Sequence, residues 1–193
     1  MTTHVRWTSA DLLAFPDDGK RRENIDGELF VSKPSNWHHN AVAGRIFSLL
    51  DSWSMQSSVG GATLAPGLIF DDGDEVVPDV AWASARVLLD NLDAAGHLLV
   101  APELVVEVLL PGVKNIQRDR EVKLKLYDQR GVAEYWIVDW PRRTVDVFRR
   151  ASERLMFVAT LGEAEVLTTP LLPGFTAELA RVFAGLPRIE EQR

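Results

Sequence analysis

A single glutamate inside an apolar segment constrains this chain more strongly than any other feature. Glu107 lies in the middle of Leu104-Val105-Val106-Glu107-Val108-Leu109-Leu110. The apolar character is continuous rather than alternating, which predicts a fully buried strand. An ionised carboxylate without a partner in such an interior costs several kcal/mol. We therefore expect Glu107 to be neutralised, paired with a cation or bound to a metal ion.

A second carboxylate, Asp79, lies within a segment that is also predicted to be a strand, over residues 75–83. If the two strands are neighbours, Asp79 and Glu107 present their carboxylates to one point in space. Val105, Glu107 and Leu109 share one face of the strand, and we expect a cleft to open on that face. Hard divalent cations such as Mg²⁺ or Mn²⁺ prefer oxygen ligands and can activate a bound water molecule. The pair is thus a candidate metal site for phosphodiester hydrolysis.

Lys123 is the natural third member of this site. Residues 116–129 are predicted to form a helix, in which Asp119, Arg120 and Tyr127 flank Lys123 at helical spacing. An ammonium group near a metal-bound water can orient the water or stabilise developing negative charge. A buried ion pair between Glu107 and Lys123 explains the same residues equally well, and composition does not separate the two explanations.

The bulk composition excludes several classes of protein. The length of 193 residues favours one domain over residues 1–193. The chain has no cysteine, which excludes disulfides, thiolate metal sites and a cysteine nucleophile. No apolar run is long enough to span a membrane, and nothing at the N-terminus resembles an export signal, so we expect a cytoplasmic protein without membrane contact.

The distribution of charge indicates where nucleic acid could bind. The net charge of −7 argues against a general nucleic-acid coat protein. The segment 114–130 nevertheless carries six basic and three acidic residues, a local charge of +3. We expect its basic residues Lys114, Arg118, Arg120 and Lys125 to contact nucleic acid, although a solvated helix face is an equally plain explanation. The strands after Tyr135 could supply a homodimer interface.

The order of the predicted elements indicates an α/β or α+β fold around one central sheet. A short helix begins near Thr8 and ends by Pro16, and an Asp26-Gly27 turn predicts a hairpin over 23–31. The remaining predicted elements are a helix at 36–53, strands at 64–70 and 75–83 joined by a turn at 71–74, a helical or irregular segment at 86–95, the strand at 104–110, the helix at 116–129, strands at 135–138, 145–148 and 157–159, and a closing helix at 175–184.

Four short strings of the sequence are distinctive: Ile25-Asp26-Gly27-Glu28-Leu29, Val77-Pro78-Asp79-Val80, Pro102-Glu103-Leu104-Val105-Val106-Glu107-Val108 and Gly131-Val132-Ala133-Glu134-Tyr135-Trp136-Ile137-Val138-Asp139. They resemble the Uma-type restriction endonuclease family, a branch of the PD-(D/E)XK nuclease superfamily. The last string is the most specific. His39 and Leu172-Pro173-Gly174-Phe175 also suit the family. The resemblance runs from about Trp7 to about Ala184.

The resemblance implies a restriction-endonuclease-like core over about 23–160, with a central mixed sheet flanked by helices. It implies a DNA endonuclease with Mg²⁺ or Mn²⁺ held by Asp79 and Glu107. The lysine usual two positions after the glutamate is replaced by Leu109, and the resemblance assigns its role to Lys123 on the following helix. Glu28 and His39 match accessory positions.

The chain departs from the family where Leu110 precedes Pro111, since the family has a serine there. An inactive nuclease-fold protein that binds nucleic acid or another partner is therefore the alternative.

Overall fold

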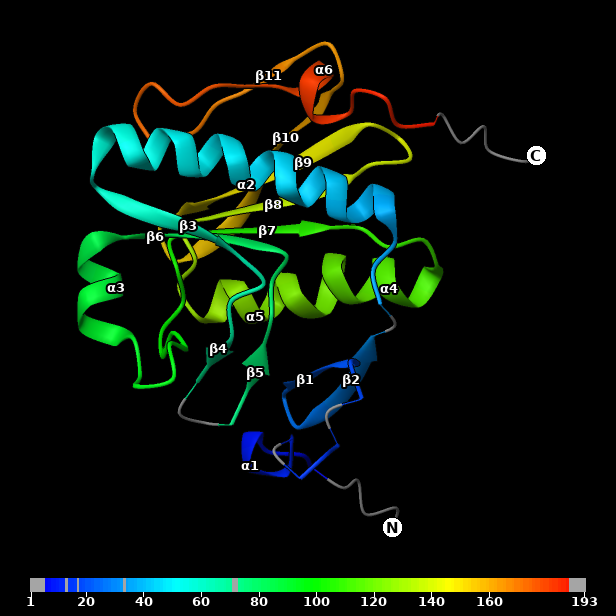
Figure 1. The fold of residues 1–193 in the computed structure, drawn as a ribbon, viewed down its shortest axis with the longest axis vertical. Coiled ribbons are helices and arrows are strands. Elements are labelled where there is room, and N and C mark those ends of the chain that lie inside the picture. The colour runs from blue at the N-terminus through cyan, green and yellow to red at the C-terminus, as the bar shows by residue number, and fades with distance from the viewer. Residues whose placement is uncertain (1–5, 13, 17, 33, 71–72, 188–193) are drawn as a thin grey trace.

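A six-stranded mixed sheet forms the centre of the computed structural model, which describes residues 6–12, 14–16, 18–32, 34–70 and 73–187 (Figure 1). Its order is β10 (Arg154–Gly162), β9 (Thr144–Ala151), β8 (Glu134–Asp139), β7 (Leu104–Val108), β6 (Val80–Ser84) and β3 (Gly60–Leu64). The β7 and β8 strands are parallel and the other neighbours are antiparallel. The predicted α+β class with a central mixed sheet is confirmed.

Helix α2 (Trp37–Ser57) covers one face of this sheet. The helix begins at its cap Asn36, whose side chain accepts a hydrogen bond from the His39 backbone N–H. Val42, Ile46 and Leu50 of α2 belong to the same apolar core as Val106 of β7. The apolar stripe of the helix therefore decides which face of β7 it covers.

The other face is covered by three consecutive helical segments, α4 (Val113–Gln117), η1 (Arg118–Val122) and α5 (Lys123–Gln129). Leu126 and Tyr127 of α5 pack in one core with Val105 and Ile137 of the sheet. Both faces of β7 are consequently buried. The expectation that an open cleft lies along the Glu107 face is wrong, because α5 covers it.

A second sheet lies on the side of α4 and α5, in the order β2 (Glu28–Ser32), β1 (Arg21–Ile25), β5 (Glu75–Val76) and β4 (Leu68–Ile69), with α1 (Ser9–Leu12) beyond it (Figure 1). The predicted hairpin is confirmed as β1 and β2. Asp26 and Gly27 both have positive φ, 55° and 79°, as a tight two-residue hairpin turn requires.

The two strands predicted over 64–70 and 75–83 are each broken, which is a correction. Residues 64–70 divide between β3 and β4, and residues 75–83 divide between β5 and β6. Pro78 has no backbone N–H for a ladder, and the chain leaves the second sheet after Val76 to enter the central sheet at Val80. Asp79 lies in this crossing. The predicted turn at 71–74 falls partly outside the described residues.

The closing helix predicted over 175–184 is also wrong in its bounds. Only α6 (Leu179–Val182) is helical, and β12 (Ala177–Glu178) pairs with β11 (Val166–Leu167) before it. Phe175 stacks on Trp136 in the core, with ring centroids 6.1 Å apart. Pairing of 177–178 with β11 holds the start of the predicted helix extended. The segment predicted as helical or irregular over 86–95 contains α3 (Ala85–Asn91).

Candidate active site

Asp79 and Glu107 are neighbours because β6 and β7 pair antiparallel. Val80 faces Val106 in this ladder, so Asp79, one residue earlier, lies beside Glu107, one residue later. The Val108 backbone N–H donates to Asp79 Oδ2 at 2.9 Å. Both carboxylates line one small pocket and are almost wholly buried, with exposures of 5% for Asp79 and 1% for Glu107.

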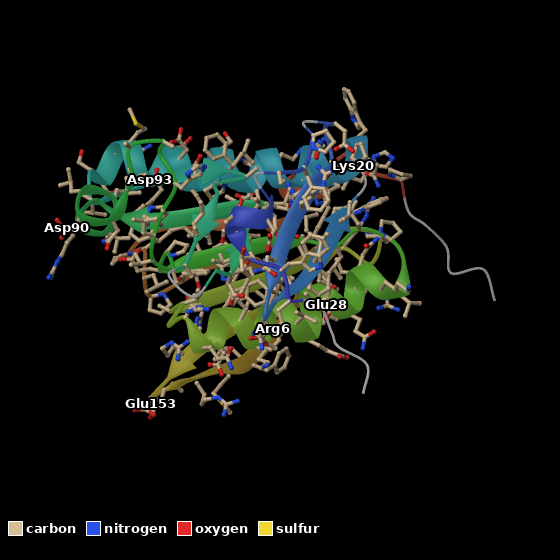
Figure 2. All side chains as sticks on the ribbon, turned by 90° about the horizontal axis from the view of Figure 1, so that it is seen from below. Arg6, Lys20, Glu28, Asp90, Asp93 and Glu153 are labelled. Atoms are coloured by element: carbon tan, nitrogen blue, oxygen red, sulfur yellow. The ribbon has the colours of Figure 1, made fainter. Side chains whose placement is uncertain are left out.

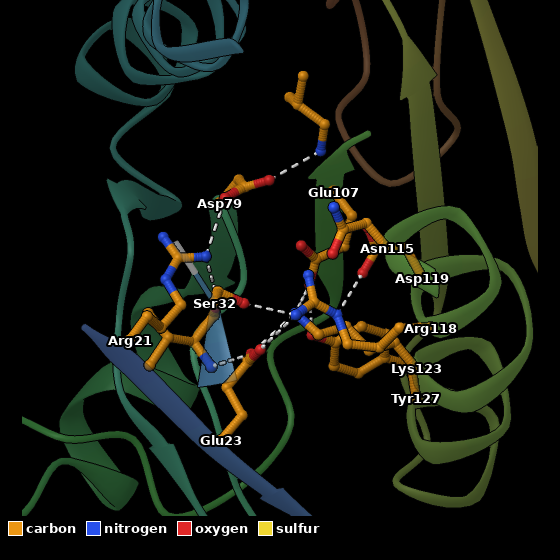
Figure 3. A network of polar contacts seen from close by, with 12 residues as sticks. Arg21, Glu23, Ser32, Asp79, Glu107, Asn115, Arg118, Asp119, Lys123 and Tyr127 are labelled. Carbon is orange, nitrogen blue, oxygen red and sulfur yellow. Dashed lines mark hydrogen bonds and ion pairs between the residues drawn. The ribbon is translucent and has the colours of Figure 1, made fainter. Parts of the chain in front are cut away.

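Three donors hold the Asp79 carboxylate. Oδ2 receives the Val108 N–H and lies 3.0 Å from His39 Nε2. Oδ1 accepts from Arg21 Nη1 at 3.1 Å, and Figure 3 shows Arg21 beside Asp79. Burial alone would raise the pKa of Asp79. The His39 hydrogen bond and the charges of His39 and Arg21 outweigh burial and hold that pKa below its usual range. Asp79 is therefore ionised at neutral pH.

The pKa of Glu107 is shifted in the opposite direction to that of Asp79. Its Oε1 accepts from Lys123 Nζ and from the Tyr127 hydroxyl, both at 2.8 Å. Burial raises the pKa of Glu107 to about 8; the Lys123 charge acts against this shift, and Asp79 adds to it. Two neighbouring carboxyl groups with pKa values pushed apart are typical of functional sites, although buried ion-pair networks also produce them.

Lys123 is fully buried between two carboxylates. Its Nζ lies 2.8 Å from Glu107 Oε1 and 2.8 Å from Glu23 Oε1. Burial would lower the pKa of Lys123, but the charges of Glu107 and Glu23 raise it, so the ammonium stays charged. The Glu107–Lys123 contact that the sequence allowed is thus present.

A π-helical turn precedes Lys123 and turns two further charged residues inward. The Lys123 backbone N–H donates to the Arg118 carbonyl, five residues earlier. Arg118 and Asp119 are both buried, and Arg118 Nε donates to Asp119 Oδ1 at 3.1 Å. Such turns inside α-helices are frequent at functional sites. The predicted cluster of Asp119, Lys123 and Tyr127 is brought to the sheet together.

Glu23, on β1, is a site residue that the sequence analysis missed. It is fully buried, binds Lys123, and accepts from the Val77 backbone N–H at 3.0 Å. Its Oε2 lies 3.6 Å from Arg118 Nη1. Burial raises the pKa of Glu23, but Lys123 and Arg118 lower it below the usual value. Burial of Glu23 could have been predicted from the sequence, because the alternation of side chains along a strand places Glu23 on the same face as the apolar Ile25.

Glu28, which the sequence analysis chose from this hairpin, has a different position. It lies at the start of β2 opposite Ile25 and is exposed (Figure 2). The contacts described around Asp79 and Glu107 do not include it.

The four residues expected to contact nucleic acid have different surroundings. Arg118 is buried and donates to Ser32 as well as Asp119. Arg120 pairs with Asp146, and Lys125 pairs with Asp26 at 2.8 Å on the surface. Lys114 is exposed at the start of α4, beside a groove lined by β2 and α4. Much of the basic charge in this segment thus neutralises acidic side chains.

The donor set fits a hard divalent ion with few protein ligands. The described residues contain no group of three or more His, Cys, Asp or Glu side chains arranged to hold a metal ion. Asp79 and Glu107 line their pocket with Ser32, Ser35 and His39. In the described part of the chain, Glu107 Oε2 makes no hydrogen bond. Mg²⁺ commonly keeps several waters and takes only one or two carboxylates, as this pocket offers.

The model of the Uma2 family, described as "Putative restriction endonuclease", matches residues 9–181. The chain belongs to the Uma2 family. The family resemblance seen in the sequence is thereby confirmed.

A solved structure from Anabaena variabilis, titled as a putative nuclease belonging to DUF820, is similar to this Uma2 protein. The TM-score is 0.73 at 17% sequence identity, over 92% of this chain and 97% of the other. At this identity the likeness shows the nuclease fold. No curated protein matches the chain. Among the described helices of this Uma2 protein, none is long and apolar enough to cross a membrane.

Proposed function

We propose that this Uma2 protein is a Mg²⁺- or Mn²⁺-dependent endonuclease that hydrolyses phosphodiester bonds in DNA. One observation carries the proposal: Asp79 and Glu107 lie side by side in one pocket, with Lys123 directly on Glu107. Family membership and the nuclease fold support the same reaction class. The proposal assigns the catalytic role to these three residues.

Asp79 and Glu107 would hold the metal ion, which supplies a nucleophilic water and Lewis-acid stabilisation of the phosphate. His39 and the Val108 N–H fix the Asp79 carboxylate through Oδ2. Tyr127 fixes Glu107 through Oε1 and leaves Oε2 without a hydrogen bond from the described residues. The two carboxylates are thus oriented by groups that are themselves buried, as a metal site requires.

Lys123 would stabilise negative charge on the phosphate or orient the attacking water. An ammonium has three N–H donors, and Glu107 and Glu23 account for two of them. The described residues provide no partner for the third donor, which would bind a phosphate oxygen or a water molecule. Because burial excludes competing water, the charge acts more strongly there than at the surface.

We further propose that Lys114 contributes to DNA binding, since it is the exposed basic residue near the start of α4. A homodimer through β10 is also a proposal. The strand lies at the edge of the central sheet, and Met156, Phe157 and Val158 are exposed on it. An exposed apolar edge strand is a ready template for pairing with another chain.

The direct experiment is cleavage of plasmid DNA by purified, EDTA-treated protein after Mg²⁺ or Mn²⁺ is added back. Asp79→Ala and Glu107→Ala should each lower the cleavage rate at least about a hundredfold. Glu121→Ala removes an exposed carboxylate of η1 and should leave the rate unchanged. Undiminished cleavage by both active-site variants would exclude the assignment.

A nuclease-fold protein that binds nucleic acid without cutting is the second candidate. Leu110 favours it, because this residue lines the pocket where the family has a polar serine. In that case calorimetry detects no Mn²⁺ binding at millimolar concentrations while DNA still binds in a salt-sensitive manner.

A further inference from the structure

Arg21 donates to Asp79 Oδ1, whereas His39 and the Val108 N–H both contact the other oxygen, Oδ2. The two donors to Oδ2 are both immobile, since the Val108 N–H belongs to β7 and the His39 ring is buried. Arg21 alone among the three donors is partly exposed, with 28% of its side chain accessible. Its Nη1 donates to Asp79 Oδ1 and to the Val77 carbonyl, both at 3.1 Å. Arg21 is therefore the donor that can leave.

The position of Arg21 also matters for the charge of the pocket. Arg21, Asp79 and Glu107 line the same small pocket. The surrounding network has four carboxyl groups, on Glu23, Asp79, Glu107 and Asp119, and three permanent cations, on Arg21, Arg118 and Lys123. Arg118 and Lys123 are buried with several partners each, so they stay in place. Arg21 is the movable positive charge nearest to Asp79 Oδ1.

We infer that Arg21 is an internal cation that a divalent metal ion must displace from Asp79, so that it sets the metal affinity of the site. This inference rests on the proposed function. A guanidinium at Oδ1 competes with the ion both for the oxygen lone pairs and through charge repulsion. When it leaves, its side chain reaches solvent without unpacking the core. Strand β1 thereby influences the metal affinity of the site, because it carries Arg21.

The test is Mn²⁺ binding measured by calorimetry on the full chain, wild type against Arg21→Met. The variant should bind Mn²⁺ about tenfold more tightly, the size expected when one unit charge beside the ion is removed. Its melting temperature should be lower than that of the wild type without metal and should rise more when Mn²⁺ is added. Arg21→Gln removes the same charge and provides a second variant in case the methionine form is insoluble.

Arg21→Lys keeps the positive charge and should bind Mn²⁺ like the wild type. Arg22→Met is the matched control, because Arg22 is the next residue of the same strand and pairs with Asp18 instead. Adding Asp79→Asn to Arg21→Met should abolish the gain in affinity. If the wild type binds Mn²⁺ and Arg21→Met binds equally or more weakly, the displacement role is overturned while the metal-dependent function stands. Absence of Mn²⁺ binding in the wild type and in both charge-removing variants would overturn both.

Discussion

Lys123 Nζ lies 2.8 Å from Glu107 Oε1, and both side chains are buried beneath α5. The same ammonium lies 2.8 Å from Glu23 Oε1, so one cation joins a carboxylate of the central sheet to one of the N-terminal hairpin. Two buried carboxylates that share one lysine are energetically interdependent. Removing Lys123 or Glu23 leaves an uncompensated charge in the interior.

Lys123→Met should therefore destabilise the fold by about 3–5 kcal/mol, the cost of breaking a buried pair by removing one member. Urea unfolding followed by circular dichroism measures this loss. Lys125→Met is the matched control, because Lys125 lies two residues later and forms a surface pair with Asp26. The control should change stability by less than about 1 kcal/mol. Equal stabilities for Lys123→Met and the wild type would show that the pair contributes nothing.

Binding of Mn²⁺ should strengthen as pH rises toward 8. Burial raises the pKa of Glu107 to about 8, and a metal ion requires the ionised form. Below that pH, each unit of decrease should weaken binding about tenfold, and the dependence should flatten above it. Calorimetry in buffers of different ionisation enthalpy should count about one proton released at pH 7.

The control for this pH dependence is Glu107→Gln, which should bind Mn²⁺ weakly at every pH. A second consequence concerns stability. The pKa of Glu107 in the folded state is above the ordinary value of 4.5, so its contribution to stability falls as pH rises from about 4.5 to about 8. A wild-type affinity that is the same at pH 6 and pH 8 would contradict the assignment of Glu107 as a ligand.

His39→Ala should weaken Mn²⁺ binding about tenfold or more, as is typical when a group that orients a ligand is lost. His39 fixes Asp79 Oδ2, whereas the neighbouring His38 contacts the Trp140 ring, with ring centroids 5.0 Å apart and the planes tilted by 42°. His38→Ala should therefore leave the affinity unchanged. The same loss of affinity in both variants would indicate a general effect on the start of α2.

The His39 pair should also make stability depend on pH. Burial lowers the pKa of His39, but the hydrogen bond and charge of Asp79 raise it above the ordinary 6.5. The contribution of the pair is complete below about pH 6.5 and is lost as pH rises through the raised value. The stability difference between wild type and His39→Ala should be larger at pH 6 than at pH 9 in urea unfolding.

Glu23→Gln should destabilise the fold by about 3 kcal/mol at pH 7, because it removes one of the two carboxylates around Lys123. The pKa of Glu23 is lowered, so this contribution is present above the ordinary value of 4.5 and is lost as pH falls below it. Glu28→Gln changes an exposed residue of the same hairpin and should alter stability by less than about 0.5 kcal/mol. A larger loss of stability in Glu28→Gln than in Glu23→Gln would show that Glu28, and not Glu23, is the structurally important carboxylate of the hairpin.

Local sequence was sufficient for elements whose own residues decide their structure. The Asp26-Gly27 turn, the apolar stripe of α2 and the unbroken apolar run of β7 each predicted the observed element. The pairing of β6 with β7, and hence the juxtaposition of Asp79 and Glu107, also agreed with the expectation from chain order. Prediction from local sequence failed where a distant segment decides the structure. Pairing with β11 holds residues 177–178 extended, and the chain changes from one sheet to the other at Pro78.

What the sequence by itself determined is that Glu107 must be neutralised, paired with a cation or bound to a metal ion, because a lone charge in an apolar strand is too costly. It also determined that Asp119, Lys123 and Tyr127 share one side of a helix, since helical spacing is a local property. Only the tertiary structure decided that Glu23, rather than Glu28, completes the cluster and that Arg21 lies on Asp79. Both contacts join residues more than fifty positions apart, and their geometry depends on how the hairpin packs against the central sheet.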